Sequence, residues 1–262
     1  MNNVIVDSKI HKNTSVIRGH GSEFGENVHF VPVIADELRQ LMLEYPCCLL
    51  KNNQTGQFGL HALLGFEPGE NLFLNDKGWS SQYIPLHIRR QPFMVGYTSM
   101  EDAPNAKNTV LTIDMDNKRV VNTDTDIDTD TDMQQHAAHL LFDGNGQPTE
   151  YLKQMNKMVF DLAQGIVRTE QFVAVLVEHD LIESIQLGVS IKQRLQRGMN
   201  ESDRQIEKIN FDGLYVINEQ KLAALSGDLL NQLHQNGYLQ ACYLIAGSMG
   251  QIQKMIAMRN EG

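Results

Sequence analysis

The sequence predicts an α+β fold, with a mostly β N-terminal half that contains one inserted helix and a mostly helical C-terminal half packed on it. Before residue 115, short apolar runs alternate with Gly, Pro and Asn, which is typical of strands separated by turns. After Gly146, apolar residues recur every three or four positions, which is typical of helices. A repeat long enough to form a solenoid or a propeller is not visible.

The apolar runs of the first half predict strands because each is short and bounded by turn residues. They are Val28–Ile34, Cys47–Leu50, Phe58–Leu64, Asn71–Leu74, Gln82–Leu86, Phe93–Tyr97 and Thr109–Ile113. Ala35–Glu44 differs, because Leu38, Leu41 and Met42 share one helical face and Pro46 follows. The first half is therefore predicted to be a sheet with one inserted helix.

The second half carries helix-start signals as well as helical spacing. Thr149 is the expected N-cap of a helix through Ile166, and a second helix is expected from Thr169. Further helices are expected after Asn218, after Ser226 and over Tyr238–Met258, with Gly237 closing the one before. One additional strand is expected at Leu214–Ile217.

Three parts follow along the chain: a β-rich part at 1–115, an Asp-rich flexible loop at 116–140, and a helical part at 141–262 that forms one integrated domain with the first. Seven aspartates lie between Asp114 and Asp132 against Lys118 and Arg119, a local charge of −5. Such a run repels itself when packed and offers few apolar residues for a core. A solvated loop is the expected structure.

The net charge of −10 argues against nucleic acid and anionic lipid as partners, because phosphate binding depends on Lys and Arg. The apolar stretches are shorter than the roughly 20 residues of a membrane helix, so the protein is not expected to be integral to a membrane. Its start lacks the pattern of a secretory leader. With three cysteines in no even framework, cytoplasmic localisation is expected.

Motifs for catalysis, metals and cofactors are not found. The chain has no HExxH, no GxGxxG, no P-loop and no GxSxG. The His136-x-x-His139 pair lacks a recognisable ligand context, and Cys47 and Cys48 lie in an apolar run typical of core. No metal and no cofactor is therefore predicted, and a non-enzyme is favoured.

One segment concentrates residue types that are common at binding sites: the only tryptophan, other aromatic residues and paired arginines. The candidate ligand- or partner-binding residues are Asn71, Trp79, Tyr83, Arg89, Arg90 and Phe93. In one interpretation they form a surface that binds a carboxylate, a peptide or an aromatic ring. In the other, the aromatic residues fill the core and the arginines pair with acidic residues.

The same residues carry a resemblance to a known family. The ordered elements are Val31-Pro32, Tyr45-Pro46, Leu64-Gly65, Gly69–Phe73, Trp79, Tyr83–Pro85 and Arg89-Arg90-x-Pro92-Phe93. They continue with Leu141–Asp143 and Gly146, Thr169 and Phe172, and Phe211–Glu219. In this order, over nearly the whole chain, they resemble the bacterial SapC-like family.

The resemblance implies which genes lie beside that of this protein, and it implies no particular reaction. Relatives are similar to proteins encoded beside flavin-dependent halogenase-like enzymes and TonB-dependent receptors, and the resemblance carries over no catalytic residues. The chain departs from the family pattern at Gln91, where relatives tend to carry an aromatic residue, and in the Asp-rich insertion.

Two functions of different classes follow. The first is a non-catalytic binding or accessory protein that serves a cluster for nutrient uptake, peptide or saccharide handling, or halogenase-like chemistry, with a protein partner or a small-molecule or peptide ligand. The second is an enzyme whose site is assembled from dispersed residues, for which His61, His87, Arg89 and Arg90 are the candidates. The oligomeric state is left open.

Overall fold

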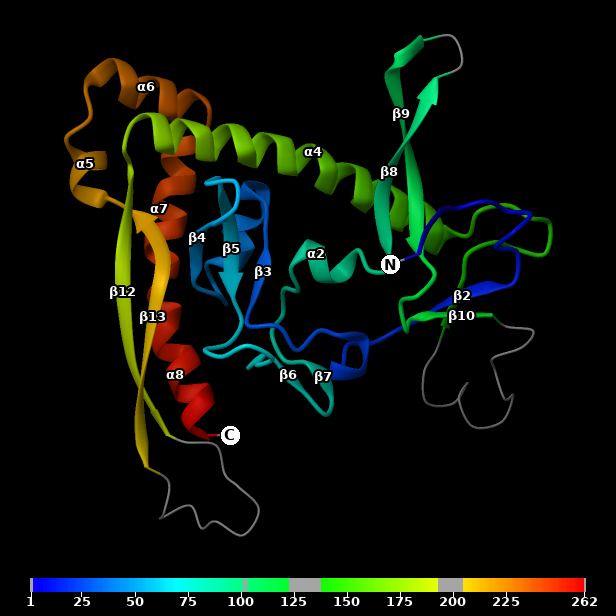
Figure 1. The fold of residues 1–262 in the computed structure, drawn as a ribbon, viewed down its shortest axis with the longest axis horizontal. Coiled ribbons are helices and arrows are strands. Elements are labelled where there is room, and N and C mark those ends of the chain that lie inside the picture. The colour runs from blue at the N-terminus through cyan, green and yellow to red at the C-terminus, as the bar shows by residue number, and fades with distance from the viewer. Residues whose placement is uncertain (1, 101–102, 123–137, 193–204, 262) are drawn as a thin grey trace. The chain divides into compact units, whose positions relative to one another are not determined.

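The computed structural model describes residues 2–100, 103–122, 138–192 and 205–261 (Figure 1). Its internal contacts divide the chain into two compact units. Unit 1 comprises Met1–Glu26, Asp76–Trp79 and Leu86–Gln164, and unit 2 comprises Asn27–Asn75, Ser80–Pro85 and Gly165–Gly262. Each unit therefore takes segments from both halves of the sequence.

Unit 1 contains two small antiparallel sheets, with strand orders β1-β9-β8 and β10-β2-β11. The strands are β1 (Asn3–Ile5), β2 (Thr14–Ile17), β8 (Phe93–Met100), β9 (Ala103–Asp114), β10 (Val120–Asn122) and β11 (Ala138–Leu140). Short elements η1 (Ser22–Phe24), β7 (Gly78–Trp79) and α2 (Leu86–Arg89) also belong to it. β8 and β9 form the long hairpin visible in Figure 1.

The core of unit 1 forms where the first turns of α4 (Glu150–Glu178) meet the strands. Leu152, Met155 and Val159 follow helical spacing, so their side chains share one face of α4. The cluster consists of Val16, Phe93, Ile113, Leu141, Phe142, Leu152, Met155 and Val159. Thr149 accepts a hydrogen bond from the Leu152 N–H at 3.3 Å, which confirms it as the N-cap of α4.

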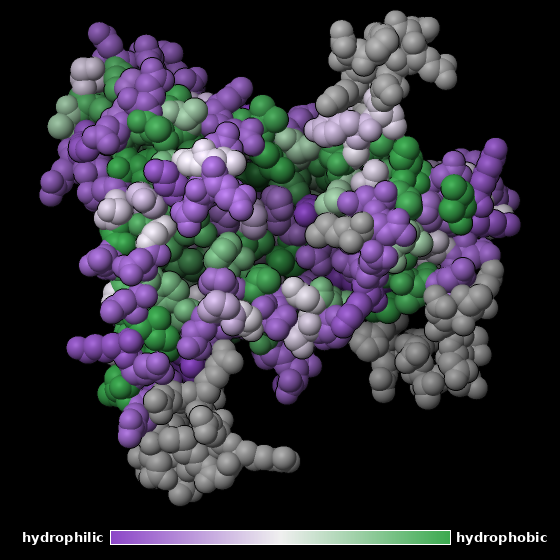
Figure 2. All heavy atoms as spheres, viewed as in Figure 1, coloured by the Kyte–Doolittle hydropathy of each residue, from purple (hydrophilic) through white to green (hydrophobic). Residues whose placement is uncertain are grey.

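Unit 2 contains a five-stranded antiparallel sheet of order β12-β13-β4-β5-β3. Its strands are β3 (Phe30–Pro32), β4 (Cys47–Lys51), β5 (Phe58–Leu63), β12 (Ile182–Lys192) and β13 (Ile206–Ile217), and β6 (Leu74–Asn75) lies in the same unit. β12 and β13 form a long hairpin, and Figure 2 shows apolar and polar residues intermixed over it.

Helices pack against this sheet: α7 contacts β4 and β13, and α8 contacts β12. The helical elements of unit 2 besides the second part of α4 are η2 (Ala35–Glu37), α1 (Leu38–Leu41), α5 (Glu219–Ala223), α6 (Gly227–Gln235), α7 (Tyr238–Ser248) and α8 (Gln251–Glu261). Cys47, Cys48 and Leu49 are fully buried in the central strand β4, which confirms that the vicinal cysteines belong to the core. Burial raises the pKa of the Cys47 thiol to about 12.

A bulge interrupts the pairing of β12 and β13. Ile185 pairs with Leu214 and Leu187 pairs with Phe211, so Asp212 and Gly213 together oppose a single residue. Gly213 has a φ of 81°, a conformation that costs a glycine little and a β-branched residue much. The Asp-Gly pair therefore allows the long hairpin to bend where it joins β4.

The α+β class is confirmed, with most of the predicted strands in the first half and helices toward the C-terminus. Several boundaries were predicted wrongly. The helices expected on either side of residue 167 are one continuous α4. Thr169 does not cap a new helix, because its hydroxyl donates to the Gly165 carbonyl one turn earlier in α4. Tyr238–Met258 is divided into α7 and α8 at Met249 and Gly250, and the segment expected as a strand at Gln82–Leu86 instead leads into α2.

The largest omission is the β12–β13 hairpin, of which only Leu214–Ile217 was predicted. The described ends of the Asp-rich region are β10 and β11, which both pair with β2. Residues 123–137, which include His136 and the alternating Thr-Asp run, lie outside the described residues. The flexible loop stays a prediction.

Candidate anion-binding pocket

A buried ion pair forms the base of the most distinctive site in unit 1. The Arg119 Nη2 lies 2.6 Å from the Glu26 Oε1, and the side chains are 5% and 0% exposed. Arg119 immediately precedes β10, where its own N–H donates to the Asn117 side chain at 3.0 Å. Glu26 lies between β2 and β3, shortly after η1, so two segments distant in the sequence supply the pair.

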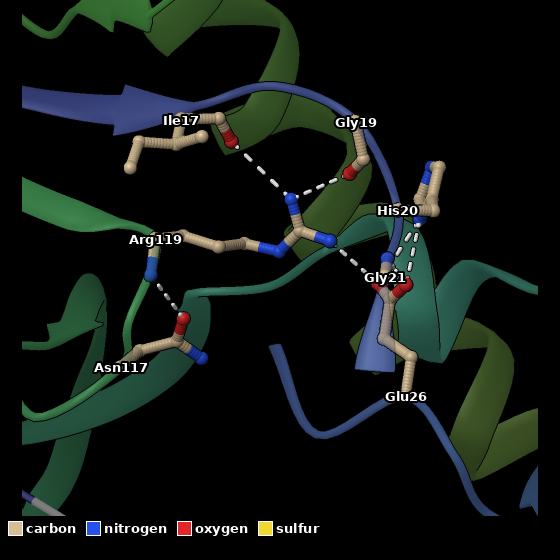
Figure 3. Close-up of polar contacts among 7 residues, drawn as sticks. All are labelled: Ile17, Gly19, His20, Gly21, Glu26, Asn117 and Arg119. Atoms are coloured by element: carbon tan, nitrogen blue, oxygen red, sulfur yellow. Dashed lines mark hydrogen bonds and ion pairs between the residues drawn. The ribbon is translucent and has the colours of Figure 1, made fainter. Parts of the chain in front are cut away.

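The rest of the Arg119 guanidinium is held by backbone and by an aromatic ring. Its Nη1 donates to the carbonyl oxygens of Ile17 at 3.2 Å and Gly19 at 2.7 Å (Figure 3). The guanidinium carbon lies 4.0 Å from the centre of the Phe24 ring. Hydrogen bonds, the ion pair and the aromatic ring together fix the position of the guanidinium, so the side chain is pre-organised.

Glu26 is equally well held. Its Oε2 accepts the Gly21 N–H at 3.0 Å, and the His20 Nδ1 donates to both carboxylate oxygens at 3.0 and 3.2 Å (Figure 3). Hydrogen bonds of this kind stabilise a buried carboxylate in its charged form. On its other side the His20 ring meets Trp79 edge to face, with centroids 5.8 Å apart.

Beside this ion pair lies a pocket of about 240 Å³, entirely within unit 1. Its lining includes three arginines, Arg18, Arg89 and Arg119, together with His20 and His139, and none of the lining residues is Asp or Glu. The protein as a whole carries a net charge of −10, so this concentration of positive charge runs against the overall composition. Such a cavity attracts anions.

The pocket also has an aromatic and aliphatic wall. His139 stacks on Tyr151 with centroids 4.1 Å apart and an interplanar angle of 3°. The Arg18 Nη2 donates to the His139 Nδ1 at 3.0 Å. Burial, and then Arg18, lower the pKa of His139, so the imidazole is neutral at pH 7. Ile88, Met155 and Met158 complete this apolar side of the lining.

Two buried polar atoms in the lining lack a hydrogen-bond partner among the described residues: the Arg119 Nε and the Gln91 Oε1. Arg119 is only 4% exposed, so its remaining N–H has little access to bulk water. Nearly all buried polar groups in folded proteins are hydrogen-bonded. Both atoms are buried within the protein, so neither is open to the pocket in this structure.

The structure places two of the six predicted site residues in unit 2, where both make internal hydrogen bonds. The Asn71 side chain accepts the Phe73 N–H at 3.0 Å, which stabilises a turn. The Tyr83 hydroxyl donates to the buried Glu37 at 2.9 Å.

The other four predicted residues lie in unit 1. Arg89 is exposed and lines the pocket, and Trp79 contacts the lining residue His20. The Arg90 Nη1 donates to the Phe93 carbonyl at 2.9 Å, and burial lowers the pKa of Arg90. Phe93 is fully buried in the core and offers no surface to a ligand. Of the six, Arg89 and Trp79 are therefore the residues associated with the pocket.

The candidates for a dispersed catalytic site are divided between the units: His61 lies in unit 2, whereas His87, Arg89 and Arg90 lie in unit 1. The His61 Nδ1 donates to the Gly59 carbonyl at 2.9 Å. Within the described part of the chain, no group of three or more His, Cys, Asp or Glu side chains has the arrangement of a metal site.

A model of the SapC family matches residues 6–255, almost the entire sequence. The chain belongs to the SapC family. No curated protein and no solved structure matches it. None of the helices in the described part of this SapC protein has the length and hydropathy needed to cross a membrane.

Glu26, Arg119, Arg18 and His139 were missed as site residues in this SapC protein. Arg119 was counted only as a positive charge within the Asp-rich region, and Glu26 stands in a loop without any motif. The signal in the sequence was weak. Asn117 and Arg119 precede a short apolar run, so a turn could be predicted there, but the ion-pair partner of Arg119 could not. A pair separated by 93 residues is formed by the tertiary fold alone.

Stability of this SapC protein is expected to fall as the pH drops from about 7.5 to about 5.5. Burial lowers the pKa of His29, His61 and His139 in the folded state. Below the unfolded value of about 6.5, the unfolded chain therefore binds more protons than the folded chain, and protonation favours unfolding. Urea denaturation at both pH values measures the effect.

His61→Gln is the matched variant for this test, because it removes one titrating group and keeps a side-chain donor for the Gly59 carbonyl. The difference in unfolding free energy between the two pH values should be smaller in His61→Gln than in the unchanged protein. Equal differences would contradict the assignment of His61 as a contributor.

Proposed function

We propose that this SapC protein is a non-catalytic binding or accessory protein that holds a small anion in the pocket of unit 1. The observation that carries the proposal is a pocket lining that contains Arg18, Arg89 and Arg119 and no acidic residue, with Glu26 behind it paired to Arg119. Charge-assisted hydrogen bonds from arginine are among the strongest that a protein makes to carboxylate or phosphate. Pre-organisation by Ile17, Gly19 and Glu26 reduces the entropy lost on binding.

A binding role is favoured over catalysis by the protonation of the pocket groups. Burial raises the pKa of Tyr151 to about 12, so its hydroxyl stays protonated at neutral pH and is a poor base or nucleophile. His139 has its Nδ1 occupied by Arg18. These groups are suited to holding a ligand in place.

Further parts of the proposal rest on family membership and on the thiols. As an accessory protein, the chain would act with products of a nutrient-uptake, peptide- or saccharide-handling, or halogenase-like gene cluster, which is the company that the SapC resemblance implies. Cytoplasmic action is supported by Cys47, Cys48 and Cys242, which are all buried as free thiols. Co-purification with the products of neighbouring genes tests the partnership.

The pocket is tested by titration with isocaproate, a carboxylate with a branched aliphatic tail. Saturable binding is expected to change the fluorescence of Trp79, the only tryptophan, because its ring contacts the lining residue His20. Arg89→Ala is expected to weaken binding about tenfold or more, since a hydrogen bond to a charged group contributes about 1.5–3 kcal/mol. Arg89 is exposed, so the fold should be retained.

Arg39→Ala is the matched control, because it removes the same charge from an exposed position in unit 2. Its affinity for isocaproate should equal that of the unchanged protein. If Arg89→Ala and Arg39→Ala bind equally well, or if neither isocaproate nor inorganic phosphate binds at all, the pocket is not an anion site.

A further inference from the structure

A second pocket, of about 610 Å³, lies entirely in unit 2 and shares no lining residue with the pocket of unit 1. Its volume is within the range of roughly 300–1,000 Å³ typical of small-molecule sites. In the described strands, β13 pairs with β4 through Leu214 and Tyr215 alone, so the bulge residues Asp212 and Gly213 are not paired with β4. The pocket lies there, beside the turn that joins β4 to β5.

Aromatic rings form the apolar part of this lining. Phe58 meets Tyr215 edge to face with centroids 4.8 Å apart, and Phe30 meets His61 in the same way at 5.4 Å. Each ring is therefore held by a neighbour, while Phe30 remains 37% exposed. Gly59 leaves room beside the imidazole, because a Cβ at its position would lie 3.0 Å from the His61 Cε1. Accessible rings held in this way pack well against the C–H groups of a ligand.

The turn between β4 and β5 supplies the polar part of the lining. The turn is fixed by its own hydrogen bonds, since the Asn52 Oδ1 accepts the Gln54 N–H at 2.8 Å and the Thr55 N–H at 3.1 Å. The side chains of Asn53 and Gln57 are exposed, and neither has a hydrogen-bond partner among the described residues. An amide group can donate and accept at once. The turn therefore places two accessible amide groups in the lining.

The charged groups around the pocket favour a neutral ligand. The described lining contains one cation, Lys51, and one anion, Asp212, and both are exposed. Burial lowers the pKa of His61, so its imidazole is neutral at pH 7. An adjoining pocket on α4, which shares part of the turn, adds Glu170 and Glu178, so an anionic ligand is repelled. A cationic ligand gains little, because ion pairs with exposed carboxylates contribute little.

We infer that this pocket binds a neutral saccharide, with the C–H face of a pyranose ring against Phe30 and its hydroxyl groups on the amides of Asn53 and Gln57. The site goes beyond the proposed function, since it belongs to the other unit and takes a ligand of another class. A neutral aromatic ligand would cover the rings, but it would not use the amides or Asp212. A pyranose uses both parts of the lining, because hydroxyl groups surround its edge and each both donates and accepts.

Matched probes test this ligand class on the whole chain. Methyl β-glucopyranoside is the neutral ring, sorbitol has the hydroxyl groups without the ring, and glucosamine and glucuronate carry a cation and an anion on the same ring. Because Trp79 lies in unit 1, binding is followed through the backbone amide NMR signals of Gly59 and Gly213, which line the pocket. Methyl β-glucopyranoside should shift these signals saturably and bind about fivefold or more tightly than sorbitol, glucosamine or glucuronate.

Phe30→Ala should weaken the binding of methyl β-glucopyranoside about tenfold, because it removes the most exposed of the four rings. Gln57→Ala should weaken it about threefold or more, because it removes a hydrogen-bonding group. Gln57 is exposed, so this variant should keep the fold. If Phe30→Ala does not fold, Gln57→Ala and the sorbitol comparison decide by themselves.

Tyr243→Ala is the matched control, because it removes an exposed ring of α7 in the same unit, outside the pocket. Its affinity for methyl β-glucopyranoside should equal that of the unchanged protein. The saccharide site is overturned if the two glycine signals do not shift, or if sorbitol, glucosamine or glucuronate binds as tightly as methyl β-glucopyranoside. It is also overturned if Phe30→Ala and Gln57→Ala both bind as Tyr243→Ala does.

Discussion

Glu26→Ala is expected to lower the free energy of unfolding by about 3–5 kcal/mol, because it leaves the buried Arg119 guanidinium without its counter-charge. The same change removes the acceptor of the Gly21 N–H and the partner of His20. Urea denaturation followed by Trp79 fluorescence measures the effect in unit 1, where the only tryptophan lies.

Glu23→Ala is the matched control in the same loop, because Glu23 is exposed. It should change the free energy of unfolding by no more than about 0.5 kcal/mol. Glu26→Gln should fall between the two variants, since its single amide oxygen can replace one of the two carboxylate oxygens that accept from Gly21 and Arg119, but it carries no charge. Similar stability of Glu26→Ala and Glu23→Ala would show that the ion pair is dispensable.

Glu70→Ala is expected to destabilise unit 2 by a similar amount, about 3–5 kcal/mol. The Glu70 Oε1 lies 2.8 Å from the Arg259 Nε, close enough for an ion pair although not aligned as a hydrogen bond, and the side chains are 3% and 6% exposed. Its Oε2 accepts the Phe66 N–H at 2.6 Å. The variant therefore leaves a buried cation and a buried N–H unsatisfied.

Urea denaturation followed by far-ultraviolet circular dichroism measures the loss of unfolding free energy. Amide hydrogen exchange in α8, which contains Arg259, localises the loss. Glu67→Ala is the control, because Glu67 is 41% exposed and its carboxylate is 3.6 Å from the same guanidinium. Its effect should be below about 1 kcal/mol. Unchanged protection of α8 in Glu70→Ala would contradict a structural role for the pair.

Local patterns predicted those elements whose formation depends on neighbouring residues. Thr149 and Asn218 were recognised as N-caps, and their side chains accept hydrogen bonds from Leu152 and Lys221. The apolar run at Cys47–Leu50 indicated a buried strand, and β4 is the central strand of its sheet. Caps, short apolar runs and helical spacing are determined within a few residues, so they can be read without the fold.

The long β12–β13 hairpin was not predicted, because the local sequence of β13 is compatible with a turn as well as with a continuous strand. In β12, Ile185, Leu187 and Val189 alternate with the exposed Gln186, Gly188 and Ser190. The β13 strand contains an Asp-Gly pair at 212–213, which ordinarily signals a turn. Here that pair forms a bulge within a continuous strand. Pairing with β12, the preceding strand, and with β4, which is distant in the sequence, decides between the two outcomes.

The sequence by itself determined the α+β class, the family resemblance and the concentration of binding-type residues around Trp79 and Arg89. Only the tertiary structure brought Arg119 to Glu26 across 93 positions and placed both beside a cavity. The physical reason is that the burial and the pairing of a charge depend on segments distant in the sequence. From its neighbours alone, an arginine in an Asp-rich stretch is expected to be solvated, and only packing against a distant loop buries it.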